Sequence, residues 1–274
     1  MKKKGILKEV IANLPSVKNG YCRIKHRKGW LEYLQDGDTA FSPKELHNTL
    51  TTVIDLEERR PRGEKLLFLR RKYAFTLMPD KTPYRTEEAL ERFIVVSNPD
   101  IFNQIPVGGG KESIDIGFNK DDSKFVFVEL KPWDSGDSPL YAVVESLKNL
   151  VEYRIIVDRN IQDSKFDEIE LMLLAPVKYY QNFHLIDEAR NLWMANVRTL
   201  EGTLCRLCAE FRTQISFRYI PIEKELFLQR CAKIYDSQKP EKQQVVALND
   251  SHRINVLARE NWTLLATGNT LSKC

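Results

Sequence analysis

Charged residues interrupt two neighbouring apolar runs of this 274-residue chain, at positions where a β-strand would bury them. Asp115 lies inside the run 113–118, and Glu129 and Lys131 close the run 125–131. Burying three charges beside so much apolar surface is costly unless they pair with one another or hold a metal ion. The chain must therefore fold in a way that gathers these charges. Such a cluster indicates a chemical role more than a contribution to stability.

Strand periodicity predicts how the three side chains are placed. Alternate residues of a strand point to opposite faces, so Glu129 and Lys131 project to the same side. If the two runs pair as adjacent strands, Asp115 lies beside Glu129. The alternative is a salt-bridged edge, in which Lys131 pairs with Asp134 and Asp115 sits in a turn.

The residue types indicate a hard cation. Two carboxylates a few ångströms apart repel each other unless a divalent ion neutralises them. Oxygen ligands without Cys or His suit Mg²⁺, with Mn²⁺ as a substitute. The expected ligands are Asp115, Glu129 and the backbone carbonyl of Leu130. A magnesium ion and Lys131 together meet the requirements of phosphodiester hydrolysis.

A further acid is expected from a helix over 87–97, whose apolar stripe contains Leu90, Phe93 and Ile94. At about 100° per residue, Glu87 borders that stripe most closely. Glu91 is the second candidate, and Glu88 is expected in solvent.

The pattern along the chain predicts a mixed α/β architecture. Helical and strand signals follow one another as a helix to Ser97, strands at about 104–107, 113–118 and 124–131, and a helix from Ser138 to about Tyr153. The continuous apolar run from Glu168 to Ala175 predicts a strand buried on both faces. A helical region over 184–212, a strand over 215–222 and a helix over 223–235 complete a mixed sheet flanked by helices.

These residues resemble the PD-(D/E)XK nuclease superfamily. The resemblance rests on Asp115, the 13-residue gap, Glu129-x-Lys131, and a Glu-bearing helix before them, and it covers about residues 86–176. The sequence around the motif most resembles that of the nuclease domain of mismatch and branched-DNA endonucleases. Ile114 stands where the superfamily name has proline, and Glu145 where that branch has glutamine.

The resemblance implies a restriction-endonuclease-like αβββαβ core. It also implies that Asp115 and Glu129 are metal ligands, Lys131 the catalytic lysine and Glu87 the helix acid. A homodimer is expected by the same analogy.

The N-terminal part of the chain is the basic part. Residues 1–80 carry 17 Lys/Arg against 10 Asp/Glu, whereas the remainder carries 25 against 28. This imbalance favours a nucleic-acid partner. A hairpin over 21–34, a helix from Ser42 to about Arg59 and a strand over 66–77 are expected here. Candidate DNA contacts are Arg23, Lys25, Arg27, Lys28, Arg70 and Arg71.

Three segments are predicted: a basic N-terminal subdomain over 1–82, a nuclease core over 83–222, and a C-terminal extension over 223–274 that no pattern assigns. The expected function is a metal-dependent DNA endonuclease of a defence, transposition or repair system, acting with other proteins of that system. The chain has no transmembrane or signal-peptide pattern, so a cytoplasmic location and no membrane partner are expected. The alternative is a non-catalytic nucleic-acid-binding or assembly protein that retains the nuclease fold.

Overall fold

A mixed six-stranded sheet forms the centre of the computed structural model, which describes residues 25–36, 42–58, 69–107, 113–158, 166–236 and 243–268. The strand order is β2-β3-β4-β5-β6-β8. The strands span Ile101–Pro106 (β2), Ser113–Asn119 (β3), Lys124–Leu130 (β4), Glu168–Pro176 (β5), Ile215–Ile220 (β6) and Thr263–Gly268 (β8). A separate two-stranded sheet pairs β1, Ala74–Leu77, with β7, Gln244–Ala247.

Strand direction changes across the sheet. Strands β2, β3 and β4 form an antiparallel meander, β4, β5 and β6 are parallel, and β8 returns antiparallel to β6. Parallel neighbours need a crossover connection, and helix α6, Pro139–Asp158, lies between β4 and β5 in the chain. Three parallel strands thus end at the same edge of the sheet, and β4 brings Glu129 there.

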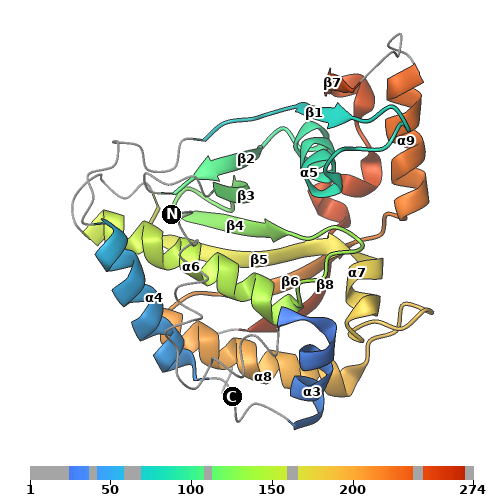
Figure 1. The fold of residues 1–274 in the computed structure, drawn as a ribbon. Helices are drawn as coiled ribbons and strands as arrows, with labels where there is room; N and C mark the ends of the chain where they lie inside the picture. Colours follow the sequence, from blue (N-terminus) through green and yellow to red (C-terminus); the bar gives the residue numbers. More distant parts are fainter. Residues whose placement is uncertain are drawn as a thin grey trace, which may run out of the picture.

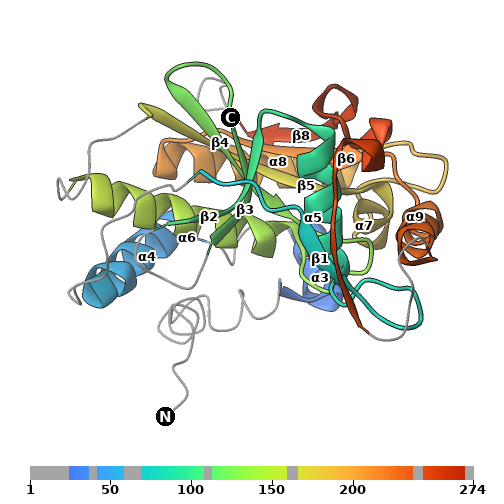
Figure 2. The same cartoon turned by 90° about the horizontal axis from the view of Figure 1, so that it is seen from above.

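Two helical layers cover the sheet (Figures 1 and 2). One hydrophobic cluster packs α6 with α3, Arg27–Asp36, α4, Pro43–Glu58, α7, Val177–Asn182, and α8, Met194–Phe211, against one face. A second cluster packs α5, Thr86–Ser97, and α9, Lys224–Asp236, against the other face. None of the helices in the described ranges combines the length and the apolar character needed to cross a bilayer.

The structure confirms a mixed α/β class and the order of elements expected over 86–176. Helix α5 is followed by β2, β3 and β4, then by α6 and β5. Helix α4 begins at Pro43, as expected, and the Ser42 hydroxyl accepts a bond from the Glu45 N–H at 3.3 Å. Helix α5 begins at Thr86, one residue before the expected start, and Arg85 precedes it without a side-chain cap bond.

The β-hairpin expected over 21–34 is wrong in its described part, because Arg27–Asp36 is helix α3. Trp30 and Tyr33, three residues apart, lie on the helix face that packs inward. The Trp30 indole donates to the Phe183 carbonyl at 2.7 Å, and the Tyr33 hydroxyl contacts Thr203. Burial of these two aromatic side chains at helical spacing stabilises a helix. This outweighs the weak alternation of apolar and polar residues that suggested strands.

Two further expectations need correction. Only Ala74–Leu77 of the strand expected over 66–77 is a strand among the described residues. The helical region expected over 184–212 begins only at Met194, and the short helix α7 at Val177–Asn182 was not predicted.

Strand pairing crosses both of the predicted segment boundaries. Strand β1 of the N-terminal segment pairs with β7 of the C-terminal segment, and β8 adds the sixth strand to the central sheet. Helices α3 and α4 bury Trp30 and Leu46 in the same cluster as α6. The described parts of all three segments thus contribute to shared sheets and cores.

Candidate active site

Strands β3 and β4 place Asp115 beside Glu129. The antiparallel register pairs Ile116 with Val128 and Gly117 with Phe127, so Asp115 and Glu129 are the next residues of the two strands. Asp115 Oδ2 accepts the Leu130 N–H at 2.9 Å, a bond that crosses from one strand to the other. The adjacency expected from strand periodicity is therefore confirmed.

Lys131 is buried at the end of β4, with only 5% of its surface exposed. Its backbone N–H donates to the Leu174 carbonyl at 3.0 Å, which continues the pairing with β5. Its ammonium group lies 2.7 Å from Glu129 Oε1 and 2.7 Å from Glu145 Oε2 of helix α6. The lysine thus joins the strand acids to the facing helix.

The alternative prediction, a salt-bridged edge, is wrong in both of its features. Asp134 pairs with Lys224 at 3.0 Å, not with Lys131. Asp115 lies within strand β3 rather than in a turn.

Helix α5 brings its acids to the same region. Glu87, in the first turn, is half-buried and forms no hydrogen bond or ion pair with another described residue. Glu91 is fully buried, pairs with Arg92 and accepts the Gln104 side-chain N–H at 2.7 Å. Glu88 was expected in solvent, but it is about one-third exposed and ion-paired with Arg92 at 3.1 Å.

Burial and mutual repulsion dominate the electrostatics of this cluster. Burial, with the charges of Glu87 and Glu91, raises the pKa of Asp115 well above its usual range. Burial, with the charges of Asp115 and Glu145, does the same to the pKa of Glu129. Burial alone would lower the pKa of Lys131, but the surrounding carboxylates hold it well above its usual value.

The cluster therefore carries more negative than positive charge. Four carboxylates act on the single ammonium of Lys131, namely those of Asp115, Glu129, Glu145 and Glu87. One buried cation cannot neutralise four partly buried carboxylates, so some carboxylates must take up protons or a further cation must bind. We call these five side chains the carboxylate cluster.

The donor atoms of the carboxylate cluster fit a hard divalent cation. Asp115 Oδ2 and Glu129 Oε1 are engaged by Leu130 and Lys131, whereas the second oxygen of each carboxylate bonds no other described residue. Within the described ranges, no group of three or more His, Cys, Asp or Glu side chains forms a ready metal cage. Mg²⁺ suits such a partial ligand set because it commonly keeps waters and binds substrate oxygens.

Sequence reasoning missed three side chains at the border of the carboxylate cluster, namely Tyr179, Asp137 and Tyr141. Tyr179 of α7 is buried and donates to the Asp137 carbonyl at 2.8 Å. Asp137 also lies 3.7 Å from the Lys25 ammonium, which sits 4.6 Å from the centre of the Tyr141 ring. In the sequence, Tyr179 is one aromatic residue among other apolar ones, and the short helix α7 that carries it was not predicted. Nothing in that pattern points to a site.

The six basic residues proposed to contact DNA have different surroundings. Arg23 lies outside the described residues. Lys25 borders the carboxylate cluster, Arg27 lies 3.2 Å from His184 Nε2, and Lys28 is exposed. Arg70 donates to the Gln104 carbonyl at 2.7 Å, and Arg71 to those of Val95 and Asn98 at 2.6 and 3.0 Å. The last two hold the backbone around α5 and β2, and contact of the set with DNA stays a prediction.

Comparison with known proteins found no match to this chain among family models, curated proteins or solved structures. What the carboxylate cluster does must therefore be inferred from its own geometry and charge.

Proposed function

We propose that this chain is a magnesium-dependent deoxyribonuclease that hydrolyses phosphodiester bonds at the carboxylate cluster. One observation carries the proposal: adjacent strands hold Asp115 beside Glu129, and the buried Lys131 that ends the second strand is charged and in contact with Glu129. The element order α5-β2-β3-β4-α6-β5 supports the further proposal of a restriction-endonuclease-like core.

The proposed roles follow from position and charge. Asp115, Glu129 and the Leu130 carbonyl would hold Mg²⁺, or Mn²⁺ in its place, and Glu87 would face it from α5. A bound metal of this kind supplies an activated water and offsets charge on the phosphate. Lys131 stays protonated and places a positive charge where negative charge develops on the phosphate. Glu145, at 2.7 Å, fixes the position of that ammonium.

The strongest alternative is a nucleic-acid-binding or assembly protein without turnover. It is favoured by one contact, since Glu129 Oε1 already accepts a bond from the Lys131 ammonium, which occupies that oxygen without a metal ion. Under this alternative, binding of DNA needs no metal and does not depend on Asp115.

The test is cleavage of end-labelled duplex, single-stranded and branched DNA with Mg²⁺, with Mn²⁺ and with EDTA. Asp115→Asn removes a proposed metal ligand while keeping an oxygen to accept the Leu130 N–H. Asp134→Asn is the matched control, because it makes the same change at an exposed acid nearby. We expect metal-dependent cutting of at least one substrate, reduced at least about 100-fold by Asp115→Asn and unchanged by Asp134→Asn.

Absence of cutting on every substrate and with both metals would contradict the proposal. Salt-sensitive DNA binding that persists in Asp115→Asn, without any cutting, would instead establish the non-catalytic alternative. A homodimer and a place in a defence, transposition or repair system are wider proposals, and both depend on cutting being found first.

A further inference from the structure

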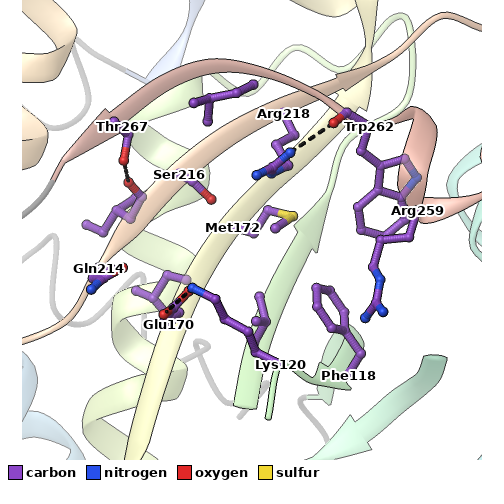
Figure 3. Close-up of a pocket in the computed structure, with 14 residues that line it drawn as sticks. Phe118, Lys120, Glu170, Met172, Gln214, Ser216, Arg218, Arg259, Trp262 and Thr267 are labelled. Atoms are coloured by element: carbon purple, nitrogen blue, oxygen red, sulfur yellow. Dashed lines mark hydrogen bonds and ion pairs between the residues drawn. The ribbon is translucent and has the colours of Figure 1, made fainter. Parts of the chain in front are cut away.

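A cavity of about 410 Å³ lies away from the carboxylate cluster. It opens on the side of the sheet to which Val126 and Met172 point, whereas Phe127 packs into the hydrophobic cluster on the other side. Strands β5, β6 and β8 and the segment around Arg259 form its walls (Figure 3). None of the carboxylate cluster residues lines it, so the cavity is a separate feature.

Cationic side chains outnumber acids in this cavity. Lys120, Arg218 and Arg259 line it against a single carboxylate, that of Glu170. Arg218 donates through Nη1 to the Trp262 carbonyl at 2.9 Å, and its other N–H groups bond no other described residue. This bond fixes the guanidinium at the cavity wall and leaves donors for an anion.

Arg259 adds a second oriented charge. Its guanidinium lies 4.6 Å from the centre of the Phe118 ring and is ion-paired with Asp100 at 2.8 Å, outside the cavity lining. The ring and the carboxylate together orient this side chain, and its guanidinium lies beside Phe118 and apart from that of Arg218 in the close-up (Figure 3).

Lys120 and Glu170 form a neutral polar region away from Arg218. The Lys120 ammonium bonds both oxygens of Glu170, at 2.7 and 2.8 Å. Figure 3 shows this pair on the other side of Met172 from Trp262. Gln214, Ser216 and Thr267 add neutral polar groups to the lining.

The polar side chains occupy positions that a sheet centre normally fills with apolar residues. Glu170, Ser216 and Arg218 lie on β5 and β6, which have neighbours on both sides. Val126, Met172 and the Trp262 ring supply an apolar surface between the charged and the neutral polar regions. This arrangement is that of a ligand site, which has an apolar body and a few placed polar groups.

We propose that this cavity binds a nucleoside monophosphate. The phosphate would bond the remaining N–H groups of Arg218, the flat base would cover Met172 and the neighbouring apolar surface, and sugar or base polar groups would meet the Lys120–Glu170 pair. The volume lies within the range of small-molecule sites, about 300–1,000 Å³. This inference does not depend on the proposed nuclease activity.

The test is isothermal titration of the full chain with the common ribonucleoside and deoxyribonucleoside monophosphates in EDTA, alongside the matching nucleosides and inorganic phosphate. We expect at least one monophosphate to bind, and to bind at least tenfold more tightly than its nucleoside or than phosphate alone. Arg218→Gln should weaken binding by about tenfold or more, since it removes a charged hydrogen bond to the phosphate.

Two controls and a second variant complete the design. Arg190→Gln makes the same change at an exposed arginine that pairs with Glu223 outside the cavity, and should leave affinity unchanged. Asp115→Asn should also leave it unchanged. Because Arg218→Gln also removes the bond to Trp262, Lys120→Gln tests the other end of the cavity at a half-exposed side chain, with Gln keeping an N–H donor for Glu170. It should weaken binding several-fold.

Several results would overturn the proposal. They are no binding of any monophosphate at millimolar concentration, equal affinity for nucleoside and nucleotide, equal affinity for inorganic phosphate, and loss of binding in Asp115→Asn. Unchanged affinity in both Arg218→Gln and Lys120→Gln, or in Lys120→Gln alone if Arg218→Gln does not fold, would overturn it too.

Discussion

Single residues of the carboxylate cluster are held at a cost in stability. Asp115 and Glu129 lie side by side on two adjacent strands, partly buried, and repel each other. Lys131 offsets part of this charge, and its two 2.7 Å contacts account for its own firm protonation. Side chains that served only stability would not be arranged so, because apolar residues of similar volume often replace buried charges at no loss.

The raised pKa values of Asp115 and Glu129 predict a pH-dependent stability. Their ordinary values are 3.8 and 4.5, and both are raised on folding, so the folded state binds more protons than the unfolded state. Their contribution to stability is present below those ordinary values and is lost as pH rises through the folded values. We expect Asp115→Asn to raise the melting temperature of the metal-free protein at pH 8 by at least about 2–4 °C, and by less at pH 5.

Bound Mg²⁺ should restore the stability that the protein loses as pH rises. Because it binds deprotonated carboxylates, added Mg²⁺ should raise the melting temperature of the unmodified protein more at pH 8 than at pH 5, and should have little effect on Asp115→Asn. Asp134→Asn controls for the loss of a charge at the surface. Equal responses to Mg²⁺ in the protein and in Asp115→Asn would show that the ion does not bind at Asp115.

At the scale of elements, the close approach of β3 to its neighbours depends on Gly117. A Cβ at this position would lie 2.5 Å from Phe125 Cε1 and 2.6 Å from Ile105 Cδ1, well inside contact distance. The Phe125 ring also stacks on Phe166, with ring centres 4.6 Å apart, so it has little room to move aside. Glycine therefore lets the aromatic side chains of β4 cover β3 two residues away from Asp115.

The two glycines 117 and 202 predict opposite effects of the same substitution. Gly117→Ala should destabilise the protein by about 1–3 kcal/mol, the usual cost of overpacking. Gly202 lies on the exposed face of α8, where an added methyl group would meet no other atom within 4 Å. Gly202→Ala should therefore stabilise the protein by about 0.5–1 kcal/mol. Urea unfolding at pH 7 measures both. If Gly117→Ala proved as stable as Gly202→Ala, the close packing around β3 would be incorrect.

At the scale of the whole molecule, the sheet gathers segments from distant parts of the chain and separates two sites. Lys131 of the carboxylate cluster contacts Glu145 of α6, and the cavity lined by Arg218 opens on the other side of the sheet from α6. Strand β8, at the far end of the sequence, supplies Leu264 and Thr267 to the cavity wall and completes the sheet. The C-terminal residues thus form part of the same structural unit as the acids of β3 and β4.

The elements that could be predicted from the sequence are those with a clear local pattern of apolar residues and turn signals. The segment 86–176 has clear periodicity and turn signals, so its elements and the meeting of Asp115 with Glu129 could be predicted. Helix α3 could not, because Trp30 and Tyr33 are placed by contacts with Phe183 and Thr203, more than 150 residues away. Strand β7 has only 4 residues and is defined chiefly by its pairing with β1.

The cavity could not be predicted either. Strand β5 was expected to be apolar throughout and buried on both faces, but Glu168 is exposed and Glu170 lines the cavity. The partner of Glu170, Lys120, lies in a turn fifty residues earlier, and the Arg218 guanidinium is held by the carbonyl of Trp262. No local pattern links these residues, since only the strand order of the sheet brings them together.

The most direct test of the central claim is the rate at which labelled DNA is cut in Mg²⁺ or Mn²⁺ when Lys131 loses its charge. Lys131→Met keeps the length of the side chain, and Lys224→Met makes the same change at the exposed lysine that pairs with Asp134. The proposed mechanism predicts cutting that falls at least about 100-fold in Lys131→Met and stays within twofold in Lys224→Met. Metal-dependent cutting at an undiminished rate in Lys131→Met would contradict it.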